Sequence, residues 1–183
     1  MYAPEKTVSI ANSMMDIWLH TENGVPLVAA PVPRLSGGSD QLYGRYAVRF
    51  RADPIDGYKT AWLLWPQSNV WPRDGEIDFP EGELDGTIHA FMHRMNATHG
   101  GDQDAFPTSK GFNAWHTAVI EWTPSSVTFI LDGTVIGRST SRIPSTPMHW
   151  VLQTETSLSS VYPAPSIQGH VQIDWVAAWR YTP

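Results

Sequence analysis

The stretch Gly75-Glu-Ile-Asp-Phe-Pro-Glu-Gly82 decides how the rest of the chain is interpreted. Its two glycines and its proline oppose a helix. A regular strand would place Glu76 and Asp78 on one face and send Glu81 to the other, because strand side chains alternate. One inserted residue, a β-bulge at Phe79-Pro80, returns Glu81 to the face of the other two acids. The stretch therefore predicts a bulged strand that presents three carboxylates together.

Alternating strand patterns lie on both sides of this stretch. Apolar residues alternate with arginines over 45–51, and the apolar alternation of 127–131 runs into an Asp132-Gly133 hairpin signal. The longest pattern is C-terminal, and one parity holds Val171, Ile173, Trp175, Ala177, Trp179 and Tyr181. This pattern predicts a long strand with one buried face.

Length and composition indicate one all-β domain. A chain of 183 residues fits a single domain, here taken as residues 1–183. Its 15 prolines and 14 glycines are scattered, which suits short strands joined by turns. Many antiparallel strands in one domain favour a sandwich of two sheets, whose concave face can hold an extended ligand in a cleft.

Charge and residue usage exclude several classes of function. The formal net charge is −6, and no block of lysines and arginines could follow a phosphate backbone or an anionic membrane. The chain has no cysteine, so disulfides and thiolate metal sites are excluded. The N-terminal residues lack the pattern of a signal peptide, and no apolar run reaches the length of a membrane span. We expect neither nucleic acid nor a membrane as partner.

The predicted carboxylate cluster suits acid–base chemistry. Three acids on one concave face repel one another, so one keeps its proton near neutral pH while another stays ionised. Glycoside hydrolysis requires such a pair. The alternatives for the same acids are a solvated strand face and a calcium site.

The sequence resembles glycoside hydrolase family 16 over about residues 43–181. The central likeness is Glu76-Ile-Asp-Phe-Pro-Glu81, which is similar to the bulged, laminarinase-like form of the signature Glu-x-Asp-x-x-Glu. Further likenesses follow in the order of the family: Tyr43-Gly-Arg-Tyr46, Ala61-Trp-Leu-Leu-Trp-Pro66, Trp71-Pro72, Trp115-His116, Val119-Ile-Glu-Trp122, Asp132-Gly133, Asp174-Trp-Val176 and Tyr181. Phe79-Pro80 departs from the aliphatic pair that is commoner in the family.

The resemblance implies a β-jelly roll and a retaining, endo-acting hydrolase of a β-1,3- or mixed β-1,3/1,4-glucan. By the family motif, Glu76 is the nucleophile, Glu81 is the general acid/base, and Asp78 tunes the nucleophile. The reaction needs no cofactor. Members of the family also bind a structural calcium through an acid of the last strand, which would be Asp174 here.

Several other residues are candidates for contact with the sugar. Trp71 and Trp115 could stack on sugar rings, although a tryptophan is more often part of the core. The family implies His93 and Arg45 in the cleft, and Gln153 lies where the family has a strand across the cleft floor, with Glu155 as the neighbouring alternative. A zinc site at His89 and His93 has the spacing of a metal-binding helix, but the segment reads as extended.

Three other functions remain open for the same sequence. A transglycosylase would pass the same covalent intermediate to a sugar, and a galactan hydrolase of the agarose or carrageenan type would use the same acids. A lectin-like module could use the same sandwich without catalysis. We expect a monomer that acts on a polysaccharide, and the substrate class implies a secreted protein.

Overall fold

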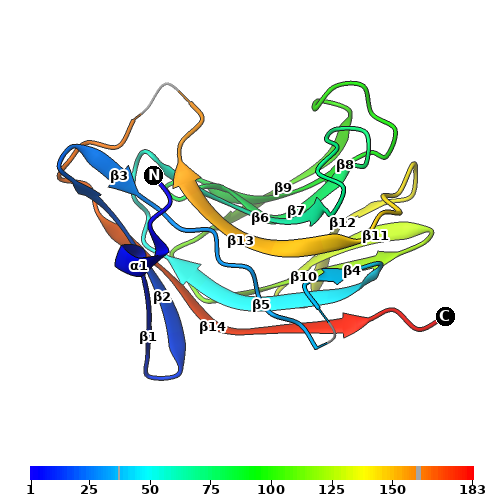
Figure 1. Cartoon of the computed structure of the whole chain (residues 1–183), viewed down its shortest axis with the longest axis horizontal. Coiled ribbons are helices and arrows are strands. Elements are labelled where there is room, and N and C mark those ends of the chain that lie inside the picture. Colours follow the sequence, from blue (N-terminus) through cyan, green and yellow to red (C-terminus); the bar gives the residue numbers. More distant parts are fainter. Residues whose placement is uncertain (37, 160–161) are drawn as a thin grey trace.

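The computed structural model describes residues 1–36, 38–159 and 162–183, and its regular structure is almost entirely β-sheet (Figure 1). One sheet has eight strands: β1 (Val8–Ala11), β2 (Met14–Glu22), β3 (Val25–Leu27), β5 (Gly44–Ala52), β10 (His116–Thr123), β11 (Ser126–Leu131), β12 (Thr134–Ser139) and β14 (Gly169–Arg180). The other has six: β4 (Asp40–Gln41), β6 (Tyr58–Pro66), β7 (Glu76–Glu83), β8 (Thr87–His93), β9 (Gln103–Gly111) and β13 (Met148–Thr156). Within the described ranges the only helix is α1 (Pro4–Thr7).

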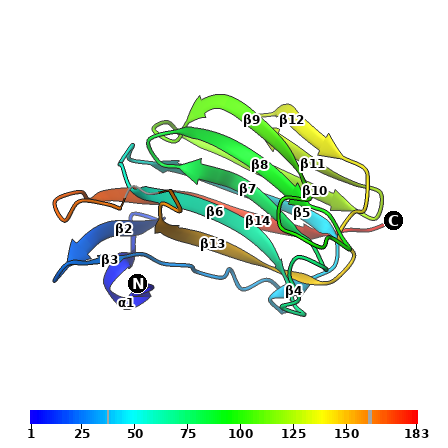
Figure 2. The same ribbon diagram turned by 90° about the horizontal axis from the view of Figure 1, so that it is seen from above.

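The two sheets form a sandwich of antiparallel strands. The larger sheet has the order β1-β2-β14-β5-β10-β11-β12 with β3 added beside β2, and the smaller has the order β4-β13-β6-β7-β8-β9. Figure 1 shows the smaller sheet lying over the larger one and bending away from it at the strand ends, and Figure 2 shows its strands side by side. The predicted two-sheet, all-β jelly roll is confirmed.

Strand alternation builds the core between the sheets. On β6 the side chains of Tyr58, Trp62 and Leu64 are fully buried against the other sheet. The apolar side chains of β5 face them, as the alternating pattern predicted. The rings of Phe50 on β5 and Trp62 on β6, for example, have centroids 5.1 Å apart. The alternate side chains of β6 therefore point away from the core, toward the hollow face of the smaller sheet, where a ligand can reach them.

The hairpin at Asp132-Gly133 is confirmed, and both residues have the positive φ that such a tight turn requires.

The prediction for the C-terminal strand is wrong in its second half. The pairing of β14 with β5 shifts register between Ile173 and Trp175, so the alternation changes parity there. As a result, Trp175 and Trp179 lie exposed on the outer face instead of in the core.

Within the described residues, no helix has both the length and the apolar character that a bilayer span requires.

Candidate active site

The predicted bulge is present in β7. On the neighbouring strand β8, Asp78 pairs with Phe91 and Glu81 pairs with His89, so three steps along β7 correspond to two along β8. The register with β6 shifts at the same place. The extra residue restores the parity of Glu81, as the sequence predicted. Phe79 points the other way and is buried in the core against Phe129.

Glu76, Asp78 and His93 form a compact cluster on the hollow face. One carboxylate oxygen of each acid and one ring nitrogen of the histidine all lie within 4.8 Å of one another. Nε2 of His93 lies 3.3 Å from Oδ2 of Asp78 and 3.8 Å from Oε2 of Glu76. Both acids are buried, Glu76 with 9% and Asp78 with 2% of its surface exposed. Gly75 has φ +75°, and a Cβ there would lie 2.7 Å from the carbonyl oxygen of His93, so this approach of β7 to β8 requires glycine.

His93 is held from its other side by a loop. Its Nδ1 donates a hydrogen bond to the carbonyl oxygen of Gly100 at 2.8 Å. In a neutral ring Nε2 is then an acceptor, so its contact with Asp78 is favourable only when a proton lies between them. The indole of Trp71 packs edge-on against the ring of His93, with centroids 5.8 Å apart, and also lies over Gly100. Trp71 is 42% exposed and is therefore accessible beside the acids.

The electrostatics of the cluster favour retention of a proton. Burial first and repulsion from Asp78 second raise the pKa of Glu76 to about 9, against the opposing effect of His93. Burial also raises the pKa of Asp78 well above its usual value, and the charge of Glu81 adds to this effect. The two carboxyls therefore share a proton at neutral pH and titrate as a pair.

Glu81 has a different partner. Nζ of Lys59 donates a hydrogen bond to Oε1 of Glu81 at 2.9 Å and lies 3.7 Å from Oε1 of Glu155. Burial lowers the pKa of Lys59, but the two carboxylates outweigh burial and raise the pKa above its usual value. Sequence reasoning did not identify Lys59 as a site residue. A lysine within the otherwise uncharged stretch 57–66 is the signal that could have found it.

Two cavities flank the acids on this face. One of about 370 Å³ borders Glu76 and is lined by Leu63, Trp65, Asn69, His149, Val151 and Gln153. The other, of about 320 Å³, borders Glu81 and is lined by Lys59, Gly82, Glu83, Gly86, Thr87, His89 and Phe91. The structure thus brings His93, Trp71 and Gln153 near the three acids, and their contact with a sugar stays a prediction.

Trp115 and Arg45 do not belong to this group, so their predicted place in the cleft is wrong. Trp115 lies beside the outer face of the eight-stranded sheet, where the guanidinium groups of Arg49 and Arg51 stack on its ring. Arg45 lies on the same outer face, over the ring of Trp179. Arg45 follows the predicted strand parity, but its strand β5 belongs to the sheet that lacks the acids, and Trp115 directly precedes β10 of the same sheet.

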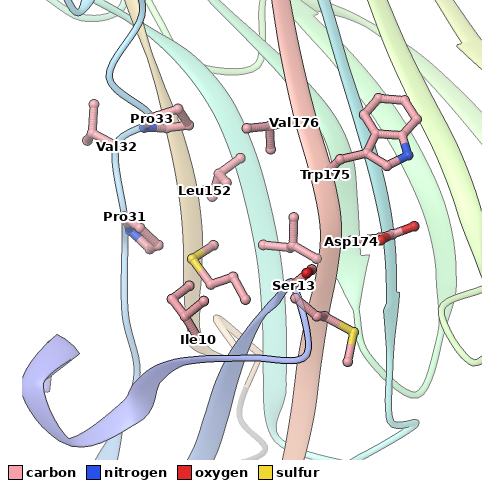
Figure 3. A pocket seen from close by; sticks show the side chains of 12 residues that line it. Ile10, Ser13, Pro31, Val32, Pro33, Leu152, Asp174, Trp175 and Val176 are labelled. Carbon is pink, nitrogen blue, oxygen red and sulfur yellow. The ribbon is translucent and has the colours of Figure 1, made fainter.

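A separate, apolar groove of about 380 Å³ lies between β14, the β1–β2 hairpin and residues 31–33 (Figure 3). Figure 3 shows Val176 on the groove side of β14, with Asp174 and Trp175 directed to the other side. Oδ2 of Asp174 accepts a hydrogen bond from Nε of Arg49 at 2.9 Å. A carboxylate already paired with a guanidinium does not fit a calcium site, which needs several oxygen ligands. Calcium at Asp174 therefore stays a prediction that this geometry does not support.

Residues 87–93 form the strand β8, as the sequence indicated, so His89 and His93 are not the paired ligands of a zinc-binding helix. Among the described residues, only Glu76, Asp78 and His93 form a group of three or more acidic or histidine side chains compact enough to hold a metal ion. The same two acids are the candidates for catalysis.

A jelly-roll sandwich with clustered carboxyls on its hollow face fits the class of glycoside hydrolases. The family model of glycosyl hydrolases family 16 matches residues 3–177, and the chain belongs to that family.

Similar proteins include a β-glucanase of Rhodothermus marinus, 30% identical over 115 residues that make up 56% of this chain and 39% of that protein. The chain thus spans well under half of the length of this relative. Among solved structures, SCLam, a non-specific endo-β-1,3(4)-glucanase, superposes with a TM-score of 0.77 at 21% identity, covering 96% of this chain and 74% of that one. A κ-carrageenase of Zobellia galactanivorans gives 0.74 at 13% identity, covering 99% and 84%. At these identities the two structures share the fold.

Proposed function

We propose that this chain is a retaining, endo-acting β-glucan hydrolase in which Glu76 is the nucleophile and Glu81 is the general acid/base. The observation that carries the proposal is the bulge between Asp78 and Glu81, which directs three acids of one strand to the same hollow face. The family membership supports it, because this is the family whose motif the three acids match.

The reaction proceeds in two displacements. In the first, a carboxylate oxygen of Glu76 attacks the anomeric carbon while Glu81 donates a proton to the departing glycosidic oxygen. The product is a glycosyl ester of Glu76 and a free chain end. In the second, Glu81 takes a proton from water, and the water oxygen attacks the same carbon and releases Glu76. The configuration at that carbon is retained, and no cofactor takes part.

Asp78 supports the nucleophile by holding the shared proton. Of these two neighbouring carboxyls Asp78 is the more deeply buried, and burial penalises the charged form, so we assign the proton to Asp78. Glu76 is then the ionised partner. The contact between His93 and Asp78 agrees with this assignment, because it also requires a proton.

The charge of the cleft favours a neutral polysaccharide. Five acids line it or lie directly beside it: Glu76, Asp78, Glu81, Glu83 and Glu155. Against them stands one lysine, Lys59, which is already paired. Such a surface repels sulfated or carboxylated chains. We therefore favour a β-1,3- or mixed-linkage β-glucan over carrageenan, and the β-glucanase relative agrees with this choice.

The test is a panel of laminarin, lichenan, agarose and κ-carrageenan, with release of reducing ends as the readout. Wild type should cleave a β-glucan, Glu76→Gln should abolish cleavage, and the matched control Glu121→Gln on the outer face should behave as wild type. Proton NMR of the first product formed should show the β-anomer.

Cleavage of an anionic galactan alone would overturn the proposed β-glucan substrate, and an initial α-anomer or full activity of Glu76→Gln would overturn the proposed mechanism. Binding without cleavage would indicate a lectin-like module, and longer oligosaccharides among the products would indicate a transglycosylase.

A further inference from the structure

Lys59 is a buried lysine in a chain with few lysines. Lys6 and Lys110 lie at the surface, whereas Lys59 is only 7% exposed. Lysine is rarely buried unless its charge is paired, because removing an ammonium group from water is costly. The burial of Lys59 beside an acid of the proposed site therefore calls for an explanation.

The position of Lys59 follows from the register of three strands. On β6 it stands directly opposite Glu155 of β13 and Glu83 of β7, and its side chain reaches diagonally to Glu81, which pairs with Ala61. Its Nζ lies 2.9 Å from Oε1 of Glu81 and 3.7 Å from Oε1 of Glu155. The ammonium group is thus held between two carboxyls that project from neighbouring strands.

The chemistry of this contact distinguishes the two oxygens of Glu81. An ammonium group only donates hydrogen bonds, so the oxygen facing it, Oε1, must accept. When Glu81 carries a proton, that proton therefore sits on Oε2. A proton on Oε1 would point at a donor and lose the contact with Lys59.

We propose that Lys59 is a positioning residue that directs the acidic proton of Glu81 to Oε2 and toward the glycosidic oxygen, with Glu155 as its anchor. This inference rests on the proposed role of Glu81 as general acid. The proton passes from Oε2 to the leaving oxygen as the bond from that oxygen to the anomeric carbon breaks. Lys59 keeps all its protons throughout and never touches the substrate's reacting atoms.

Leaving groups of different basicity test this role. A sugar leaving group needs protonation, whereas 2,4-dinitrophenolate leaves without it. The two substrates are an oligosaccharide of the β-glucan found by the panel and the 2,4-dinitrophenyl glycoside of the same sugar. Lys59→Met should lose about 10²-fold in kcat/KM on the oligosaccharide, within the range of general acid catalysis. On the dinitrophenyl glycoside it should lose less than about threefold, because that step does not need the acid.

Three further variants complete the experiment. Lys59→Arg keeps a donor-only cation and should restore most of the lost kcat/KM. Glu155→Gln leaves Lys59 in place with a weaker anchor. It should lose less kcat/KM than Lys59→Met, again mainly on the oligosaccharide. This variant also tests the proposal if Lys59→Met does not fold. The matched control Lys110→Met should equal wild type on both substrates.

The failure of this inference is separable from the failure of the proposed function. Equal losses on both substrates, or no loss on either, would overturn the role of Lys59 while wild-type cleavage still supports the hydrolase. If wild type cleaves neither substrate, the proposed function fails, and the role of Lys59 fails with it.

Discussion

The imidazole of His93 faces the carboxyl of Asp78, with 3.3 Å between Nε2 and Oδ2. Nδ1 of the same ring is fixed by the carbonyl oxygen of Gly100, so the ring cannot turn away without losing that hydrogen bond. The cluster therefore has a positionally fixed neighbour that lowers the pKa of Glu76 and so opposes the effect of burial on the proposed nucleophile.

His93→Gln should move the acidic limb of the pH profile of kcat/KM to higher pH. His93 lowers the pKa of Glu76, and without it burial and Asp78 raise that pKa further. Since Glu76 attacks as a carboxylate, a higher pKa means that a higher pH is needed for the same ionised fraction. We expect a shift of about one pH unit, the scale of a nearby charge. The control His170→Gln, on the outer face, should leave the profile unchanged, and an unshifted profile for His93→Gln contradicts the assignment.

Glu76→Gln should stabilise the folded protein increasingly as the pH rises. Burial raises the pKa of Glu76 to about 9 and the pKa of Asp78 above its usual value, so the folded pair keeps its shared proton, whereas both carboxyls of an unfolded chain lose theirs at about pH 4. The folded state therefore binds more protons and loses stability as the pH rises between these values. Glutamine does not titrate and is free of this loss. From pH 5 to pH 8 the difference in free energy of unfolding should widen by up to a few kcal/mol, because each pKa unit corresponds to about 1.4 kcal/mol. Urea unfolding at both pH values measures it, and a constant difference would falsify the buried-acid interpretation.

Trp71→Ala should raise KM about tenfold with a smaller effect on kcat, if the indole beside the acids is a platform for a sugar ring. Gly100→Ala should act in the same direction, because a Cβ there would lie 2.3 Å from the Trp71 ring and force it to move. Stacking of a ring on an aromatic side chain is worth about 1 kcal/mol or more. Trp115→Ala is the matched control, since Trp115 lies by the outer face. Equal values of KM for Trp71→Ala and wild type would remove Trp71 from the binding site.

Phe79→Ala should lower the free energy of unfolding by about 3–5 kcal/mol, as for other buried aromatic residues. Its side chain is 1% exposed and packs edge-on against Phe129, with centroids 5.6 Å apart. Chemical denaturation measures the loss. Val135→Ala, at a position that is 60% exposed, should change the stability by less than about 0.5 kcal/mol. A loss below about 1 kcal/mol for Phe79→Ala would show that the bulge does not depend on this anchor.

The part of the site that lies on one strand could be predicted from the sequence. Three acids and a proline within six residues left few geometries, and the bulge follows from strand parity once all three acids are required to share a face. The family resemblance led to His93 and Gln153, and both lie on strands of the same sheet as β7.

The errors concern relationships between strands that are distant in sequence. The parity of Arg45 was right, but parity does not tell which sheet a strand joins, and β5 joins the sheet without the acids. A single register shift at Asp174 redirected Trp175 and Trp179 outward, and no residue of the pattern signals it. Lys59 was missed because its role depends on two partners, Glu81 and Glu155, that lie 22 and 96 positions further along the chain.

The bulge of β7 also bears on how such a site can change by insertion and deletion. If Pro80 were deleted, the strand would read Glu-Ile-Asp-Phe-Glu, and ordinary alternation would place all three acids on one face without any irregularity. The pairing beyond Glu81 would keep its register, because the extra residue lies between Asp78 and Glu81. The shorter and the longer strand are thus two solutions to one geometric requirement, a single codon apart, and a lineage could pass between them without losing its catalytic acids.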